Sequence, residues 1–248
     1  MGPTWKPEDS RPRTHWGQDI AELQSVTLRV KHILAWWRMD RSLHPETLSQ
    51  QSLPVGISCL CRIDPGLCRV IIQLGNPPLW PREPGFPTMI HIILEQQVSL
   101  ASAEAAFARL EAAAGELTPE RFLSLTDAEL REIGFSRQKT GYGRELSRAI
   151  LSGELDLAGL QSLDDATVRS KLMAIRGIGP WTADIYLLMA LLRPDVWPSG
   201  DLALAKAVQR LYGLDERPAP ETLTAMAERW RPWRAVTARI LWHYYLNQ

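Results

Sequence analysis

Two apolar helical segments near the middle of the chain are separated by only a short turn rich in glycine. The first segment is followed by the sequence IRGIGP, residues 175–180, which contains the turn and leads directly to Trp181 in the second segment. Two glycines this close let the backbone adopt positive φ and approach a ligand without Cβ collisions. Pro180 fits the first turn of the second helix, where its missing N–H costs nothing. The pattern predicts a helix-hairpin-helix unit.

A hairpin of this kind can bind an anion through its backbone. The amides left free at the start of the second helix point outward, and the helix dipole favours negative charge there. Gly177, Ile178 and Gly179 would supply the backbone for a nucleic-acid phosphate. An ordinary helix corner without a ligand is the alternative, and the turn alone does not decide between them.

Helical periodicity continues from about residue 88 to the C-terminus, and glycines and prolines mark the breaks. The expected helices are 88–98, 101–114, 119–123, 127–132, 136–151, 165–174, 180–192, 202–212, 220–230 and 232–246. Alternation with a period of two is scarce, so the sequence predicts an all-α core. The prolines between Ile63 and Arg82 predict a connector, with a weak strand-like piece at Leu67 to Leu74.

Composition places few limits on function. The chain has 28 Lys and Arg against 28 Asp and Glu, whereas a nucleic-acid binder usually shows a basic surface. Two groups of basic residues stand out, and either could be a merely solvated face: Arg137, Lys139, Arg144 and Arg148, and then Arg229, Arg231, Arg234 and Arg239. No run approaches the roughly 18 apolar residues that span a membrane, and the N-terminus lacks the pattern of a secretory signal. We expect an intracellular, soluble protein of the cytoplasm or nucleoid, with no membrane partner.

The three cysteines argue against a metal or disulfide framework. Cys59, Cys61 and Cys68 form a loose cluster with no partner elsewhere in the sequence. Their spacing supplies no closed four-ligand metal site.

Three sequence blocks together carry a family resemblance. They are IILEQQVS at residues 92–99, RGIGPWTA at 176–183 with Asp201 downstream, and RPWR at 231–234. In this order, they make the chain similar to the HhH-GPD superfamily of base-excision DNA glycosylases, within it most of all to the 3-methyladenine DNA glycosylase II branch. The resemblance covers about Gly75 to Gln248.

The resemblance implies an all-α fold of two lobes with the cleft for DNA and the flipped base between them. A helical barrel lobe would run from about 98 to 201, and a second lobe would combine about 61–97 with 202–248. Residues 1–60 would form an N-terminal extension of unclear structure. The chain would act as a monomer on damaged double-stranded DNA. Some relatives hold an iron–sulfur cluster with four cysteines after the catalytic region, and no cysteine follows Cys68 here.

Asp201 is the catalytic candidate. On position alone it is an ordinary helix N-cap, a role in which most aspartates do nothing else. The resemblance implies more, because the superfamily's catalytic aspartate lies at this distance after the hairpin. A carboxylate at a helix N-terminus is stabilised in its charged form, as a glycosylase needs. Trp181 stands where bifunctional relatives carry a catalytic lysine, so we expect base removal by water without strand cleavage.

The resemblance also suggests residues for the base pocket and for DNA contact. Trp181 and Trp233 would wall the pocket, because indole faces attract cationic alkylated bases, although both could equally be core tryptophans. Ile185 lies where some relatives carry a tyrosine, which leaves the breadth of substrates open. Gln97 would fill the gap left by a flipped base, and Arg234 would contact a phosphate or the pocket rim.

The expected function is therefore monofunctional excision of alkylated purines, of the 3-methyladenine and 7-methylguanine type. Two alternatives remain: a glycosylase for uracil, hypoxanthine or oxidised purines, and a non-catalytic DNA-binding hairpin protein. No cofactor is expected. The family's hairpin carbonyls can hold a monovalent cation, and this would lie near Ile175 and Ile178.

Overall fold

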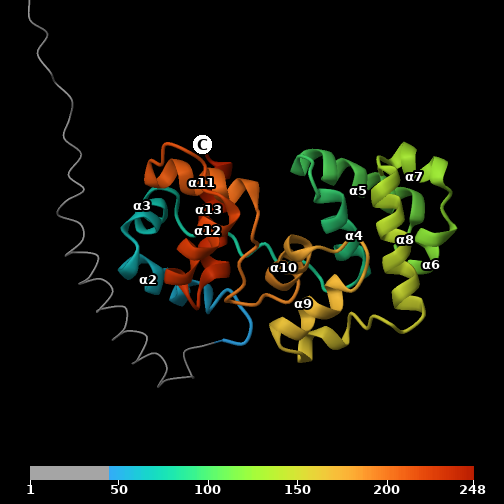
Figure 1. Ribbon diagram of the computed structural model, residues 1–248, viewed down its shortest axis with the longest axis horizontal. Helices are drawn as coiled ribbons and strands as arrows, with labels where there is room; N and C mark the ends of the chain where they lie inside the picture. Colours follow the sequence, from blue (N-terminus) through green and yellow to red (C-terminus); the bar gives the residue numbers. More distant parts are fainter. Residues whose placement is uncertain (1–44) are drawn as a thin grey trace, which may run out of the picture. The chain divides into compact units, whose positions relative to one another are not determined.

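The computed structural model describes residues 45–248, in which helices joined by loops are the regular structure (Figure 1). The expectations for residues 1–44, a helix-like stretch from about Ile20 to Trp37 among them, lie outside the described residues. No β-strand occurs in residues 45–248, and the prediction of an all-α fold is confirmed.

Twelve α-helices and two short 3-10 turns follow one another in the described part of the chain. They are α2 (Leu53–Ile63), α3 (Pro65–Leu74), α4 (Phe86–Glu95), α5 (Leu100–Ala114), α6 (Pro119–Ser124), α7 (Asp127–Ile133), α8 (Arg137–Leu151), η2 (Gly159–Ser162), α9 (Asp165–Met173), α10 (Pro180–Met189), α11 (Leu202–Tyr212), α12 (Pro220–Ala227), η3 (Glu228–Trp230) and α13 (Arg234–Leu246).

Helix α13 is the centre of one group of helices. It packs against α2, α3 and α11, and Figure 1 shows it among them. Every residue from Ala235 to Trp242 is buried, so α13 has no solvent-facing side along this stretch. A helix that is buried all round contributes apolar contacts in every direction, which explains how one helix holds three others.

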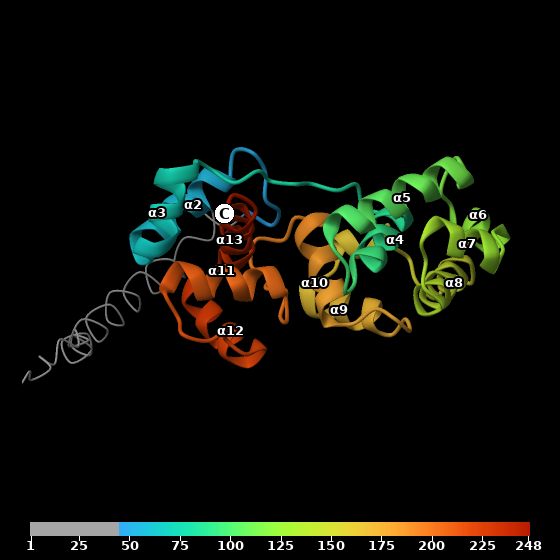
Figure 2. The ribbon, with the colours of Figure 1, turned by 90° about the horizontal axis from the view of Figure 1, so that it is seen from above.

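Helix α4 is the corresponding centre of a second group. It packs mainly on α5, α8 and α10, with α9 against α10 and α6 against α8, as Figure 2 shows from above. We expected α4 to join the C-terminal helices, because residues 61–97 were assigned to the second lobe. The structure differs: α4 buries seven of its ten residues, from Phe86 to Leu94, among the helices that follow it.

The predicted connector between Ile63 and Arg82 is wrong in its first half. Residues 65–74 form α3, and the strand-like piece at Leu67 to Leu74 lies within this helix. Pro65 begins the helix rather than breaking it, since its fixed φ suits the first helical position. Asp64 caps the helix by accepting from the amides of Gly66 and Leu67. The expected domain boundary at residue 60 lies inside α2, and the compact unit begins at Pro45.

The other helix ends follow the chemistry of their caps. Thr126 and Glu129 form a reciprocal capping box at the start of α7, and Gly134 ends this helix in a left-handed conformation. Gly213 ends α11 in the same way.

Within residues 45–248, no helix has the length and apolar character that crossing a membrane requires.

Candidate active site and nucleic-acid interface

Asp201 occupies the N-cap of α11, as the sequence predicts. Its Oδ1 accepts a hydrogen bond of 2.9 Å from the amide of Leu204, and the residue is only 8% exposed. The preceding Gly200 has φ +81, which lets the chain turn sharply into the cap. A buried carboxylate is costly unless its oxygens are satisfied, so its other contacts matter.

Two indole N–H groups complete the surroundings of this carboxylate. Trp181 Nε1 in α10 donates to Asp201 Oδ2 at 2.9 Å, and Trp242 Nε1 in α13 donates to Oδ1 at 3.2 Å. With the amide of Leu204, three N–H donors face one carboxylate, an arrangement that complements negative charge. Asp201 therefore lies where the α4 group, through α10, meets the α13 group.

Of the two tryptophans predicted for the pocket, only Trp181 lies at Asp201. Trp233 is 3% exposed and packs on α2, where a Cβ on Gly56 would lie 2.7 Å from its ring. Its indole N–H finds no partner within the described part of the chain. Trp242, which was not among the predicted site residues, is the second tryptophan that contacts Asp201.

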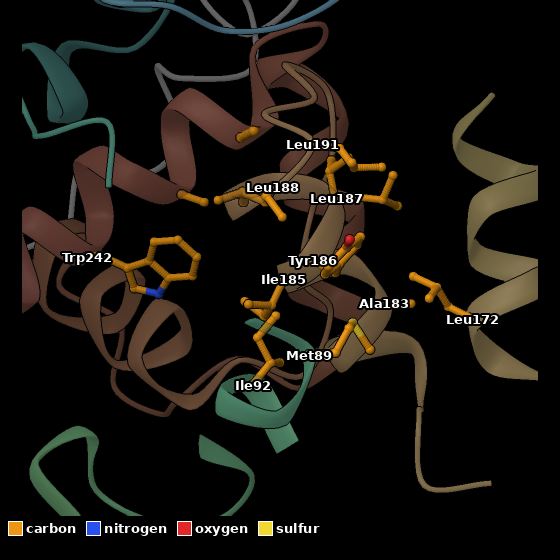
Figure 3. Close-up of a cluster of buried hydrophobic side chains, with 14 of the residues drawn as sticks. Met89, Ile92, Leu172, Ala183, Ile185, Tyr186, Leu187, Leu188, Leu191 and Trp242 are labelled. Atoms are coloured by element: carbon orange, nitrogen blue, oxygen red, sulfur yellow. The ribbon is translucent and has the colours of Figure 1, made fainter. Parts of the chain in front are cut away.

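Ile185 follows Trp181 by one helical turn and is buried. Figure 3 shows its side chain between Trp242 and the residues Met89 and Ile92 of α4. Ile185 thus forms an apolar wall beside the indole of Trp242, one of the two indoles that donate to Asp201.

In the hairpin between α9 and α10, one of the two glycines adopts the positive φ that the sequence predicts. Gly177 has φ +96, and a Cβ there would lie 2.0 Å from Cγ of Tyr142 on α8, so only glycine fits. Gly179 is different: its φ is −92 and no atom lies within 4 Å of a Cβ built on it. The backbone at Gly179 is therefore open to a ligand approaching the start of α10.

The loop between α4 and α5 is fixed to this hairpin. Gln96 Nε2 donates to the carbonyl of Gly177 at 3.0 Å and to Oγ1 of Thr182 at 2.9 Å. The next residue, Gln97, is exposed and adopts a left-handed conformation with φ +57, which is unusual for a residue other than glycine. The hairpin thus positions an exposed polar side chain next to itself.

A partly buried ion pair connects the two hairpin helices. Arg169 Nε of α9 donates to Asp184 Oδ1 of α10 at 2.5 Å. Burial raises the pKa of Asp184 above its ordinary value, while the nearby Arg169 acts in the opposite direction. The pair is a structural tie beneath the hairpin turn.

Arg234 is fully engaged within the protein. Its guanidinium donates to Asp195 Oδ1 at 2.8 Å and to Glu228 Oε1 at 3.0 Å, and the side chain is 11% exposed. Arg231 joins the same acidic pair. These contacts anchor the start of α13, and they leave Arg234 less available for a phosphate than the sequence suggested.

The two carbonyl oxygens proposed to bind a monovalent cation still have lone pairs that can coordinate one. Ile175 O accepts one hydrogen bond, from the amide of Ile178 at 3.1 Å, which leaves a second lone pair. For Ile178 O, the described residues provide no hydrogen-bond donor. The donor set of the turn therefore fits such an ion.

Three features occur together: a glycine hairpin, a buried aspartate twenty residues after Trp181, and an all-helical scaffold. This combination defines a class of DNA repair proteins. The HhH-GPD superfamily of base excision DNA repair proteins matches residues 90–233, more than half of the chain. The chain belongs to this superfamily.

Individual relatives agree with this assignment. The chain is similar to the DNA-3-methyladenine glycosylase of Bacillus subtilis, with 28% identity over 246 residues that cover 94% of this chain and 75% of that protein. A second Bacillus subtilis relative is 35% identical over 162 residues, which are 62% of this chain but only 56% of that protein. The structure resembles the Schizosaccharomyces pombe 3-methyladenine DNA glycosylase in complex with abasic DNA, with a TM-score of 0.72, 26% identity, and coverage of 75% and 94%.

Proposed function

We propose that this chain is a monofunctional DNA glycosylase that hydrolyses the N-glycosidic bond of alkylated purines, of the 3-methyladenine and 7-methylguanine type, in duplex DNA. Its main support is the carboxylate of Asp201, held by the indole N–H groups of Trp181 and Trp242 next to the hairpin helix α10. The names of the Bacillus subtilis and Schizosaccharomyces pombe relatives agree with this activity.

The donors to Asp201 suit the chemistry of base release. When the bond between C1′ and the base nitrogen breaks, the base leaves with the bonding electrons and the sugar becomes oxocarbenium-like. All three donors to Asp201 are neutral N–H groups, from Leu204, Trp181 and Trp242. No cationic side chain of residues 45–248 pairs with this carboxylate, so its charge is available to stabilise the sugar cation until water adds to C1′ and passes a proton to the carboxylate.

Alkylated purines suit a site of this composition. A methyl group on N3 or N7 gives the base a positive charge, which makes it a better leaving group and attracts it to an indole face. Trp181 is only partly buried and has one edge held by Asp201, so its ring can form one side of a base pocket. Ile185 and Trp242 would line its interior, in place of the expected Trp233.

Water, rather than an amine, is the proposed nucleophile. Lyase chemistry needs a lysine at the sugar, and Trp181 stands at the corresponding hairpin position. The ammonium group of Lys139, on α8, donates a hydrogen bond to the carbonyl of Leu94 at 2.7 Å. Burial lowers the pKa of Lys139 below its ordinary value. This contact holds the lysine on the α4–α8 packing surface.

DNA binding would use the hairpin and the adjoining loop. The open backbone at Gly179 would bind a phosphate, with the exposed Gln97 filling the space of the flipped base. The carbonyls of Ile175 and Ile178 would hold a monovalent cation, which adds positive charge near this phosphate. We expect one chain to act alone on one lesion in double-stranded DNA.

The test is release of free base from N-methylated duplex DNA by the wild type and two variants. Asp201→Asn should release no measurable base, because the amide carries no charge. Asp64→Asn is the matched control: Asp64 is also a buried N-cap aspartate and accepts an indole N–H, from Trp230 at 2.8 Å. It should retain base release per folded molecule, while its free energy of unfolding falls by about 1–3 kcal/mol.

Other results would change the assignment. An active Asp201→Asn variant would remove Asp201 from catalysis. Release of uracil, hypoxanthine or oxidised purines alone would change the substrate class. Binding to an abasic-site analogue without release of any base would indicate a non-catalytic hairpin protein, and a covalent adduct trapped by borohydride would indicate a lyase.

A further inference from the structure

Two adjoining surface pockets lie beside the hairpin, on α7 and α8. The larger has a volume of about 480 Å³, and its lining residues are Arg137, Gln138, Gly141, Tyr142, Glu145 and Arg176. The smaller, of about 290 Å³, is lined by Asp127, Arg131, Phe135, Arg137 and Thr140. Arg137 lines both pockets, so they adjoin, and we call the two together the arginine groove.

The acidic side chains of the arginine groove are already neutralised. Glu145 accepts from Arg148 at 2.9 Å, and Asp127 accepts from Arg144 at 2.6 Å. Three other arginines have side chains that make no hydrogen bond or ion pair with any residue from 45 to 248: Arg131, Arg137 and Arg176. The groove therefore presents uncompensated positive charge, in contrast to the paired Arg234 near the C-terminus.

The start of α8 is also unfavourable for the charges it carries. Arg137 and Lys139 lie in the first turn of this 15-residue helix, and that turn contains no acidic residue. The positive end of the helix dipole disfavours cations there, which is an electrostatic cost to the free protein. A bound anion reverses the sign of this cost, because it interacts favourably with both the dipole and the side chains.

The arginine groove continues directly from the hairpin. Arg176 lies in the hairpin turn, immediately before Gly177. Tyr142 lines the groove and also packs on Gly177, at the position where a Cβ would lie. A DNA strand whose phosphate contacts the hairpin backbone can therefore continue along the protein surface into the arginine groove.

We propose that the arginine groove binds backbone phosphates of one duplex arm beyond the phosphate at the hairpin, and so extends the contact with DNA. This inference rests on the proposed function, because it requires DNA at the hairpin. A series of three arginines matches a polyanion, which in DNA carries a charge every 3.4 Å along each strand. The polar lining from Gln138, Thr140 and Tyr142 suits a hydrated phosphate backbone better than an apolar ligand.

The test measures affinity for a duplex with a central abasic-site analogue, at several salt concentrations. Arg137→Ala and Arg176→Ala should each raise Kd about five- to tenfold, as expected for one charge-assisted contact. Each should lower the slope of log K against log salt by about 1. The control is Arg69→Ala, an exposed arginine of α3 that has no salt bridge within residues 45–248, and it should leave both quantities unchanged. Glu145→Gln should act in the opposite direction and tighten binding about twofold.

Shortening one duplex arm at a time locates the contact. The difference between the wild type and the Arg137→Ala/Arg176→Ala double variant should disappear when one particular arm is shortened, and remain when the other is. An unchanged Kd and salt slope in the double variant would overturn the proposal. So would a difference that persists whichever arm is shortened, because the arginines would then act only through the hairpin.

Base release by the wild type is measured separately. If the wild type releases alkylated bases while the double variant binds DNA like the wild type, the groove assignment fails and the proposed function stands. Loss of the thermal unfolding transition is not expected, since Arg137 and Arg176 are exposed. Arg131→Ala provides a further variant, at the far end of the groove, for which the same decrease in salt slope is expected and an unchanged slope counts against the proposal.

Discussion

Two aspartates of this protein share a local structure but differ in charge balance. Asp64 and Asp201 both cap a helix, both are buried, and both accept indole N–H groups. Asp64 also contacts the guanidinium of Arg229 at 3.2 Å, so its charge is compensated within the protein. Asp201 has only neutral donors and forms no salt bridge with residues 45–248. At the residue scale, this uncompensated charge distinguishes a candidate catalytic carboxylate from a structural one.

Replacing single tryptophans by phenylalanine tests the tryptophan contacts of the site. Trp242→Phe and Trp181→Phe each remove one N–H donor from Asp201, and base release should fall about tenfold for a loss of 1.4 kcal/mol. Trp233→Phe is the matched control, because the indole N–H of Trp233 has no hydrogen-bond partner in the described residues. Its rate per folded molecule should stay within about twofold of the wild type.

Single-turnover release of base from N-methylated duplex DNA measures all three variants. A rate for Trp233→Phe below that of Trp242→Phe would mean that Trp233, rather than Trp242, lines the base pocket. Urea unfolding of each variant corrects for the packing lost with the larger ring.

The choice between Trp233 and Trp242 shows the limit of sequence reasoning at this scale. The two residues are about two and a half helical turns apart, so they face opposite sides of α13. An amphipathic helix would reveal which side faces the core, but α13 is buried all round from Ala235 to Trp242. By contrast, the N-cap position of Asp201 and the place of Trp181 in the first turn of α10 could be predicted, because the hairpin and the N-cap are local features.

At the scale of elements, the hairpin separates two uses of glycine. Gly177→Ala should lower the free energy of unfolding by about 3 kcal/mol, since it combines a positive φ with a clash against Tyr142. Gly179→Ala should change stability by less than about 0.5 kcal/mol, because its φ is negative and its Cβ meets no atom. The same Cβ would stand between the backbone and a phosphate, so affinity for DNA should fall about tenfold.

Urea denaturation and duplex binding measure the two effects independently. A Gly179→Ala variant that binds DNA as tightly as the wild type would place the phosphate elsewhere. A stable Gly177→Ala variant would require Tyr142 to move, and the binding data would then show whether the arginine groove moves with it.

Helices with strong local signals can be predicted, including α6, α10 and α12, which begin at a proline; α3 is the exception. The stop of α7 at Gly134 and of α11 at Gly213 follows from left-handed glycine caps. Pro65 was interpreted as part of a connector, although the preceding Asp64 makes it the first residue of α3. Proline removes one amide hydrogen, and this breaks a helix interior but costs nothing in the first turn. The place of the proline relative to a capping residue is therefore the informative signal.

At the scale of the whole molecule, the site depends on contacts that connect the two helix groups. The arrangement of α4, α10 and α13 could not be predicted, because these helices carry buried residues on most sides and so lack a directional pattern. Arg239 is the central connection. It is fully buried and donates to three carbonyls: Leu79 O at 2.8 Å, Leu188 O at 2.7 Å and Ala235 O at 3.0 Å.

These carbonyls belong to the segment before α4, to α10 and to α13, so one side chain holds all three in place. Burial lowers the pKa of Arg239 to about 9, and the guanidinium is still charged at neutral pH. Arg239→Lys keeps the charge, but a single ammonium group cannot reach carbonyls that the planar fork of arginine reaches in different directions. The free energy of unfolding should therefore fall by about 2–3 kcal/mol, as expected for the loss of charge-assisted hydrogen bonds in the interior.

The urea midpoint, with an unchanged denaturant slope, measures this loss. Arg148→Lys is the control, since Arg148 is exposed and paired only with Glu145, and its midpoint should remain that of the wild type. Asp201 receives one donor from α10 and one from α13, so a looser connection should also slow base release by the folded Arg239→Lys enzyme. Equal stability and equal rates in Arg239→Lys and the wild type would mean that apolar packing of α13 alone positions the carboxylate.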